Sequence, residues 1–463
     1  MDYTKLLDYD KKIKLGIVGA SQGFGYTSLV QLKNVDQIDV RIVCSIDIEA
    51  SYNALIESGY NKEKIVICHN AEEMKRTDES EIIVVDDYKL VLESGISSVL
   101  EATGNMDVGT YIAENALTNG INVYMVSKET DSFSGTYFNQ LAHENNTVYA
   151  LVNGDQPRNL VDLYSWGKLL GLNIVAAGKS SEYDFVFDRD SGKLTYTDGK
   201  EVYHDKPEIM NAWEYEDTST LQQRFESLKE LTGTIAADVC EINLVSNVTG
   251  LLPAAPGLNY PIAKVNELAE IFVPKEDGGI LDRSGVVDVF YQLREKNEPS
   301  FAGGVFIVFE LTNNEIMVDL LRGKGHIISK SGKYGCIYQP YHMMGLEAPL
   351  SIILGERLGV GTRHDTRQVS VMAGVAEEDL KAGNTFTVYG HHHEIKDVKP
   401  QLFERNEAKD AVPFYLLNNI TLKNDVNKGE VIGFEDIEVD STQKNTFDVY
   451  QKGLSLEVGV KSF

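Results

Sequence analysis

The stretch Lys14-Leu-Gly-Ile-Val-Gly19-Ala-Ser21-Gln-Gly23-Phe-Gly25 runs from a short apolar strand pattern into a helix that begins near Phe24. A glycine-rich turn at such a junction lets backbone N–H groups and the positive end of the helix dipole face a pyrophosphate. The pattern predicts a dinucleotide site contacted by Gly19, Ser21, Gly23, Phe24 and Gly25, although Ser21 stands where the usual spacing has a glycine. A structural strand–turn–helix unit without a ligand is the alternative.

Apolar runs of strand length alternate with amphipathic segments of helix length from residue 13 to about residue 151. Such runs indicate parallel strands that are buried on both faces. The first third of the chain is therefore predicted to be α/β, a doubly wound Rossmann domain. The expected strands are 13–19, 39–46, 81–85, 98–103, 122–126 and 147–152, and the expected helices include 107–119 and 134–145.

Asp47 lies at the end of the second expected strand. A carboxylate at that place accepts hydrogen bonds from the ribose hydroxyls of the adenosine and repels a 2′-phosphate. No Arg follows it in residues 48–52, which favours NAD over NADP.

Polar residues also follow the next two strands, at the edge where a parallel sheet faces its cofactor. Thr103, Gly104 and Asn105 end the strand 98–103 and are expected to contact the dinucleotide, with a plain turn capped by Asn105 as the alternative. Lys128 and Glu129 follow the strand 122–126, and they are expected to contact the substrate. Lys128 could orient or protonate the substrate oxygen, but a solvated surface Lys is equally compatible with the pattern.

The later chain changes character. Residues 182–220 are rich in Asp, Gly, Tyr and Lys without a clear period, which predicts excursions from a sheet. Beyond residue 303 the pattern is strand-rich, and from about residue 369 short strands and turns predict a small all-β unit. The other expected elements are helices at 159–170, 220–231, 235–247 and 341–354 and a strand at 173–177.

The composition excludes several classes of partner. Seventy acidic and 43 basic residues give a formal charge of −27, which repels phosphate backbones and anionic lipids, so we expect neither nucleic acid nor membrane as a partner. An anionic substrate would then need a local basic pocket. No apolar run approaches the roughly 18 residues of a membrane span, and the first residues lack the pattern of a signal peptide. The four cysteines are scattered, which indicates a cytoplasmic protein.

Eight segments share their residues and their order with one protein family. They are Glu101-Ala-Thr-Gly-Asn105, Gly154-Asp155-Gln-Pro157, Ala176-Ala-Gly-Lys179, Asn247-Val-Thr-Gly-Leu251, Gly278-Gly-Ile-Leu-Asp-Arg283-Ser-Gly285, Pro340-Tyr-His-Met-Met-Gly-Leu-Glu347, 378–383 and 422–430. They resemble the homoserine-dehydrogenase-related NAD(P)-dependent oxidoreductases with a C-terminal SAF-type domain, a family that includes a bacterial 1-deoxy-D-xylulose 5-phosphate reductoisomerase-like enzyme.

The resemblance implies a Rossmann domain (1–153), a central α+β catalytic and dimerisation domain (154–368), a SAF-like β domain (369–463), and a homodimer or higher homo-oligomer. It places Lys128 beside the nicotinamide and places Lys179, Asp155 and Arg283 near the cleft. The segment Thr234-Ile-Ala-Ala237 departs from the family, which would have a Lys-bearing segment there. This departure puts the reductoisomerase reaction itself in doubt.

Hydride transfer needs a group that stabilises or protonates the reacting oxygen. Lys128 and Lys179 are the candidate catalytic residues, and Arg283 could clamp a carboxylate or phosphate or else form a bridge to Asp282 or Glu276. The Tyr164-x-x-x-Lys168 pattern of short-chain dehydrogenases leaves most of the chain unexplained.

We therefore predict an NAD(P)-dependent dehydrogenase or reductase, without a metal, acting on a small hydroxy or carbonyl compound that bears a carboxylate or phosphate. The alternatives are a homoserine dehydrogenase, a sugar-phosphate reductoisomerase and a non-catalytic NAD(P)-binding sensor.

Overall fold

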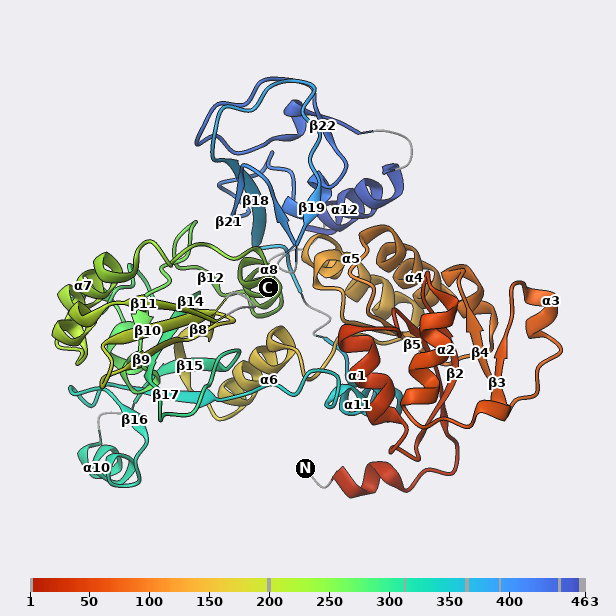
Figure 1. Cartoon of the computed structure of the whole chain (residues 1–463). Helices are drawn as coiled ribbons and strands as arrows, with labels where there is room; N and C mark the ends of the chain where they lie inside the picture. Colours follow the sequence, from red (N-terminus) through yellow and green to blue (C-terminus); the bar gives the residue numbers. More distant parts are fainter. Residues whose placement is uncertain are drawn as a thin grey trace. The chain divides into compact units, whose positions relative to one another are not determined.

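The computed structural model describes residues 3–197, 201–311, 314–362, 366–390, 393–439 and 443–457. The chain, whose elements are labelled in Figure 1, divides into two compact units. Unit 1 consists of Met1–Arg158, Met343–Gln368 and Val439–Phe463, and unit 2 consists of Asn159–His342 and Val369–Glu438. The division into three domains at residues 153/154 and 368/369 stays a prediction.

Unit 1 is built on a seven-stranded sheet in the order β3-β4-β2-β1-β5-β6-β7. All of its strand pairs are parallel. Its strands are β1 (Ile13–Val18), β2 (Ile38–Cys44), β3 (Ile65–Ile67), β4 (Ile82–Val85), β5 (Ser98–Glu101), β6 (Asn122–Met125) and β7 (Tyr149–Leu151). The six strands predicted from apolar runs are confirmed. The strand β3 was not predicted, because it is a three-residue edge strand that is only partly buried.

Helices cover both faces of this sheet. One core cluster joins the sheet to α4 and α5 through Ile112 and Phe138, and another joins it to α1 and α11 through Leu29 and Ile352. The strands are therefore apolar on both sides, which explains their unbroken hydrophobic runs. The helices of unit 1 are α1 (Gly23–Leu32), α2 (Ile48–Glu57), α3 (Ala71–Met74), α4 (Met106–Thr118), α5 (Lys128–Asn145), α11 (Ala348–Leu358) and α12 (Lys444–Glu457). A further helix, α6 (Gln156–Leu169), begins in unit 1 and continues into unit 2.

Three of these helices correct the predictions. The helix α5 begins at Lys128 rather than at residue 134, and α11 begins at Ala348 rather than at residue 341. The chain from residue 369 was expected to be all-β, but α12 ends the described chain as a helix packed beside α5 and α4 (Figure 1). Thr446 donates a hydrogen bond of 2.6 Å to Asp107, and Lys452 pairs with Glu114 at 2.6 Å.

Unit 2 holds a mixed sheet of ten strands, with the main order β11-β10-β9-β14-β8-β15-β17-β16 and with β12 and β13 paired to β14. The strands are β8 (Asn173–Ser180), β9 (Phe185–Asp188), β10 (Lys193–Thr197), β11 (Glu201–Asp205), β12 (Leu252–Pro253), β13 (Ile262–Ala263), β14 (Val286–Glu295), β15 (Val305–Glu310), β16 (Ile327–Ile328) and β17 (Tyr334–Gln339). The expectation that residues 182–220 leave the sheet was wrong, because β9, β10 and β11 extend it. The outward residues of β9 and β10 include Asp188, Lys193 and Thr195, and these polar residues hid the strand pattern.

The helices of unit 2 are α7 (Thr218–Leu228), α8 (Ala236–Thr249), α9 (Leu268–Ile271) and α10 (Glu315–Gly323). The C-terminal part of this unit is antiparallel, in the order β18-β21-β20-β19, with a separate pair β22-β23. Its strands are β18 (Ser370–Ala376), β19 (Val388–Tyr389), β20 (Glu394–Ile395), β21 (Val398–Glu404), β22 (Thr421–Leu422) and β23 (Ile437–Glu438). Up to Glu438 the prediction of short strands is confirmed.

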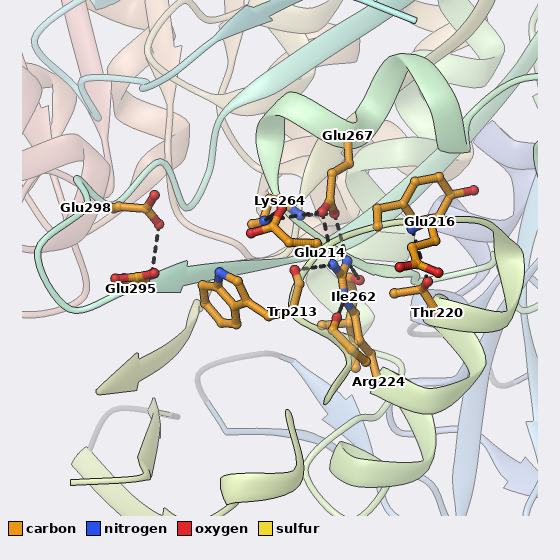
Figure 2. Close-up of polar contacts among 12 residues, drawn as sticks. Trp213, Glu214, Glu216, Thr220, Arg224, Ile262, Lys264, Glu267, Glu295 and Glu298 are labelled. Carbon is orange, nitrogen blue, oxygen red and sulfur yellow. Dashed lines mark hydrogen bonds and ion pairs between the residues drawn. The ribbon is translucent and has the colours of Figure 1, made fainter. Parts of the chain in front are cut away.

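A buried ion pair fixes α7 in unit 2. Figure 2 shows the Arg224 side chain between the Glu267 carboxylate and the backbone at Trp213 and Ile262. The two Nη atoms reach the Glu267 oxygens at 2.7 and 2.9 Å, and Nε donates to the Ala212 carbonyl at 2.8 Å. Arg224 has no exposed surface, and all of its five N–H groups have acceptors. This saturated pair is structural.

Candidate functional site

The glycine turn lies at the point where the strand order of unit 1 reverses. From β1 the chain builds the sheet first toward β2 and β4 and later, on the other side, toward β5, β6 and β7. Such a switch point leaves a crevice at the carboxyl ends of the strands where nucleotides bind. Gly19 follows β1 directly, and its N–H donates to the Cys44 carbonyl at 2.8 Å.

Two glycines of the turn are required by close packing. Gly19 has φ +90°, and a Cβ there would lie 2.4 Å from the Ala102 carbonyl oxygen. A Cβ on Gly25 would lie 2.1 Å from the Gly19 carbonyl oxygen. Only glycine therefore allows α1 and the end of β5 to approach the turn this closely.

The N-terminus of α1 is open to a ligand. The helix begins at Gly23, which has φ +56° and has no heavy atom within 4 Å of an added Cβ. Gln22, at the N-cap, makes no side-chain capping hydrogen bond, while Ser21 and Phe24 are half-buried. An uncapped helix N-terminus beside a glycine turn suits a phosphate anion.

Asp47 is exposed at the N-cap of α2, just after β2. Its Oδ1 accepts a hydrogen bond from the Ala50 N–H at 2.9 Å. This capping accounts for an Asp at the position, and the contact with a ribose stays a prediction.

The turn after β5 is held by the carboxylate of Glu101, for which no role was predicted. Glu101 is fully buried, and it accepts hydrogen bonds from the Thr103 hydroxyl and, at 3.0 Å, from the Thr103 N–H. Burial raises the pKa of Glu101 to about 7, against the lowering effect of hydrogen bonds from Ser127 and Thr103. Gly104 donates its N–H to Ser127 Oγ at 2.8 Å. A buried acid that titrates near neutrality thus lies at the edge where the cofactor is expected.

Asn105 caps α4, because its side chain accepts hydrogen bonds from the Asp107 and Val108 N–H groups at 3.0 and 3.1 Å. The capped-turn interpretation therefore holds for this side chain. Lys128 and Glu129 are the first two residues of α5, Lys128 half-buried and Glu129 buried.

Two of the family-like segments meet in unit 1. Gly154 has φ +88°, and a Cβ there would lie 2.7 Å from the Met343 carbonyl oxygen. Gly345 has φ +79°, and a Cβ there would lie 2.1 Å from Thr27 Oγ1 of α1. The segment 343–347 therefore packs against the Gly154 turn and the first helix. Asp155, next to this contact, accepts a hydrogen bond from the Gln156 N–H at 3.0 Å.

Unit 2 holds the second candidate centre around Lys179, at the end of β8. The residue is 2% exposed, and its Nζ lies 2.7 Å from Asp238 Oδ1 and also donates to Glu241. Asp238 and Glu241 are one turn apart on α8 and so share a face. The other oxygen of Asp238 accepts hydrogen bonds from Ser181 Oγ at 2.7 Å and from the Tyr260 hydroxyl at 3.4 Å.

This centre, which we call the Lys179 centre (Lys179, Ser181, Asp238, Glu241 and Tyr260), combines one ammonium with two carboxylates. Burial lowers the pKa of Lys179, but Asp238 and Glu241 outweigh that effect, so the net shift is upward. Burial raises the pKa of Asp238 in spite of the opposing effect of Lys179. A group of this kind holds a proton in a dry environment and can pass it on.

The centre also bears on the departure at residues 234–237. A Lys-bearing segment was expected ahead of Glu241, but the cation at the start of α8 comes from Lys179 on β8. The partners Asp238 and Ser181 were missed. Two carboxylates at i and i+3 on a buried helix are the signal that could have found Asp238.

Arg283 forms a bridge, but not with the partners considered from the sequence. Its Nη2 donates to Glu404 and, at 3.1 Å, to the Pro253 carbonyl. Asp282 instead pairs with Lys275 at 2.7 Å. Arg283 is partly exposed, so its role toward a substrate stays a prediction.

The described part of the chain holds no group of three or more His, Cys, Asp or Glu side chains that could bind a metal ion. In a run of three histidines, His391 and His392 lie outside the described residues. Among the helices of the described chain, none combines the length and the apolar character that crossing a bilayer requires.

Residues 154–348 match the family described as oxidoreductase DRL, catalytic domain. This match supports the prediction of an oxidoreductase and covers the segment that carries the Lys179 centre. No curated protein matches the sequence.

Solved structures that the chain is similar to include two dehydrogenases and a reductoisomerase. The WlbA dehydrogenase from Bordetella pertussis, in complex with NADH and UDP-GlcNAcA, is 14% identical with a TM-score of 0.27 over 39% of this chain and 49% of that one. The 1-deoxy-D-xylulose 5-phosphate reductoisomerase from Zymomonas mobilis in complex with NADPH is 12% identical with a TM-score of 0.31, and the match covers 51% of this chain and 58% of that one. The scyllo-inositol dehydrogenase from Lactobacillus casei with bound NAD(H) and scyllo-inositol is 14% identical with a TM-score of 0.33, and the match covers 75% of this chain and 87% of that one. The match spans about half the length of the first of these.

Proposed function

We propose that the protein is an NAD(P)-dependent dehydrogenase or reductase that transfers a hydride between the nicotinamide and a small hydroxy or carbonyl compound bearing a carboxylate or phosphate. The observation that carries the proposal is the glycine turn at the switch point of a parallel sheet, with an uncapped helix N-terminus behind it. The match of residues 154–348 to an oxidoreductase catalytic domain supports it.

The residues of unit 1 fit a dinucleotide. The main-chain N–H groups around Gly19, Ser21 and Gly23 would hold the pyrophosphate, with Phe24 and Gly25 continuing into the helix. Asp47 would hold the adenosine ribose, and Thr103, Gly104 and Asn105 would line the nicotinamide side. When bound, the cofactor supplies or accepts the hydride.

Two lysines are proposed for the oxygen of the substrate. Lys128 follows β6 at the same sheet edge as the glycine turn, where an ammonium can stabilise a developing alkoxide. Lys179 would hold the transferred proton at Nζ, and Asp238 and Glu241 keep that nitrogen protonated between turnovers. Glu129, Asp155 and Arg283 are proposed to bind the polar groups of the substrate.

The organisation proposed alongside is a cytoplasmic homodimer or higher homo-oligomer with a SAF-like C-terminal β domain. A homoserine dehydrogenase is the first alternative activity, and a sugar-phosphate reductoisomerase is the second. A non-catalytic NAD(P)-binding sensor differs from all of these in class, because it would bind cofactor without turnover.

The test measures cofactor binding and turnover separately. Calorimetry with NADH and NADPH is followed by absorbance of the reduced nicotinamide with a panel of sugar phosphates, aldonates and amino-acid alcohols. We expect Lys128→Ala and Lys179→Ala to lose turnover and keep cofactor affinity. Unchanged turnover removes both lysines from the mechanism, turnover with no panel member favours the sensor, and no binding of either coenzyme at millimolar concentration contradicts the proposal.

Asp47 decides between the two coenzymes. Replacing it by Ala removes the carboxylate that repels a 2′-phosphate, so we expect kcat/KM with NADPH to rise relative to that with NADH. Asp217→Ala, which also removes a carboxylate cap but from α7 of unit 2, serves as the control for lost capping. A coenzyme preference that Asp47→Ala leaves unchanged shows that this carboxylate does not face the ribose.

A further inference from the structure

Three strands of unit 2 present one polar face to solvent. In the ladder of β10, β9 and β14, Thr195 pairs with Val186 and Val186 pairs with Arg294. Two residues further along these strands, Lys193 of β10 pairs with Asp188 of β9. Lys296 follows the last residue of β14 and donates its N–H to the Phe187 carbonyl at 3.1 Å. Because side chains alternate along a strand, these rows lie on the same face.

The opposite face of these strands is core. Phe185, Phe187, Leu194 and Leu293 are buried together there, none more than 1% exposed. The strands that carry the polar face are therefore held in place, because their opposite face packs in this core.

The polar face is hollowed. A cavity of about 520 Å³ is lined by seven residues, which are Val186, Asp188, Ser191, Lys193, Thr195, Arg294 and Lys296. Three of them are cationic, one is a carboxylate and two carry hydroxyl groups. In a chain with 70 acidic and 43 basic residues, a hollow in which cations outnumber carboxylates three to one is unusual. It is the kind of local basic pocket that an anion needs on so acidic a protein.

The cations of this hollow are only partly neutralised. Lys193 is exposed and has no ion-pair partner among the residues that the structure describes. Lys296 pairs with Asp188 at 3.2 Å, a contact open to solvent. Arg294 donates Nε to the buried Asp184 at 2.5 Å and Nη1 to the Glu298 carbonyl at 2.8 Å. None of the described residues accepts a hydrogen bond from its Nη2.

Of the other acids nearby, Asp205 is the cross-strand partner of Lys193 and so lies on the same face of the sheet, but it does not line the hollow. Glu295 lies on the opposite side of β14 and pairs with Arg189 at 2.5 Å, and Glu298 accepts a hydrogen bond from the Glu295 N–H at 2.8 Å. Asp188 is the one carboxylate among the residues that line the hollow, and it opposes an anion there.

We propose that this hollow binds a small molecule with two anionic groups, phosphate or carboxylate. One group would lie on Arg294 with Thr195, and the other on Lys193 and Lys296 with Ser191. The two rows are separated by two residues of strand, roughly 6–7 Å, which sets the spacing of the groups. The site is separate from the Lys179 centre, because Lys179 pairs with Val289 and so lies on the other face of β14 from Arg294.

The experiment uses the full chain and isothermal calorimetry at low salt, with citrate and inorganic pyrophosphate as probes. We expect saturable binding of at least one probe. Lys193→Gln should weaken it about three- to fivefold, the effect of one exposed charge contact. Asp188→Asn should tighten it, because it removes the opposing carboxylate and releases Lys296.

Controls separate this site from other anion sites. Lys381→Gln removes an exposed lysine of the same unit, paired with Asp425 at 2.8 Å, and should leave binding unchanged. The titrations are repeated with saturating NADH, which occupies the glycine turn if the proposed function is correct. Thermal melting of each variant verifies folding.

The opposite results overturn the proposal. One is that neither probe binds saturably at millimolar concentration, and another is that NADH abolishes the binding. The others are that Lys193→Gln and Lys381→Gln lose affinity equally, or that Asp188→Asn binds the probe more weakly than the wild type does. None of these depends on turnover, so the dehydrogenase proposal can fail while this one stands.

Discussion

Replacing Lys179 by Met would leave two carboxylates in the interior of unit 2 without their cation. Lys179 is 2% exposed, and Asp238 and Glu241, its two partners, are equally buried. Removing one member of a buried ion pair costs about 3–5 kcal/mol, because the remaining charge has neither water nor partner. For a folding unit of this size the loss corresponds to a decrease in Tm of roughly 6–20 °C.

The size of this loss should depend on pH in one direction. Burial already raises the pKa of Asp238, and Lys179 opposes that rise, so its removal raises the pKa further. A carboxyl whose folded pKa lies above its unfolded value of about 3.9 holds a proton in the folded state that the unfolded state releases. Stability is then lost as the pH rises through the folded pKa. Relative to the wild type, the Lys179→Met variant should lose the most stability at pH 8 and regain part of it toward pH 5.

Thermal melting at pH 5, 6, 7 and 8 measures the effect on the wild type, on Lys179→Met and on the double variant Lys179→Met with Asp238→Asn. We expect the double variant to be more stable than the single one at pH 8, because it removes one of the two unpaired charges. A loss of Tm that is the same at all four pH values, or a double variant less stable than the single one, would refute the account of the Lys179 centre.

Gly19→Ala should weaken NADH binding at least tenfold in a fluorescence titration, because the added Cβ would lie 2.4 Å from a backbone oxygen. Gly59→Ala is the control, because Gly59 also has a positive φ but has open space around it, so the backbone strain of about 1–3 kcal/mol is similar and NADH binding should stay unchanged. If both variants weakened NADH binding equally, backbone strain and not the close contact would be the cause. Arg224→Met should lower stability by about 3–5 kcal/mol in denaturant unfolding, whereas Lys229→Met on the exposed face of the same region should change it by less than about 1 kcal/mol. Glu101→Gln should flatten the dependence of Tm on pH between 6 and 8. Its folded pKa of about 7 lies above the unfolded value, so the wild type loses stability as the pH rises through 7, and an unchanged slope would mean that Glu101 does not titrate there.

The elements that could be predicted are those with a strong local pattern. Six strands of unit 1 were found because parallel strands covered on both faces must be apolar throughout. The helix α4 was found from its periodicity and its cap at Asn105. In contrast, β9 and β10 were missed because their second face is polar, and α12 was missed because its apolar side is defined only by α4 and α5, far away in the chain.

The residues of the candidate site also fall into those that could be predicted from a local pattern and those that could not. Gly19 and Gly25 could be identified from the sequence, since a glycine turn between a strand and a helix is a local feature. Asp238 and Glu101 could not, because nothing local distinguishes a buried carboxylate with partners from an exposed one. Arg283 shows the limit most clearly, since its bridge partner Glu404 is 121 residues away.

By itself the sequence determined the parallel sheet of unit 1 and the position of its glycine turn, because burial on two faces and a positive φ each demand a particular kind of residue at a particular place. Only the tertiary structure decided which charged groups meet. Lys179 and Asp238 are 59 residues apart, and their pairing depends on how α8 packs on β8. A charge is stabilised by whatever lies next to it in space, and no periodicity along the chain records that neighbour.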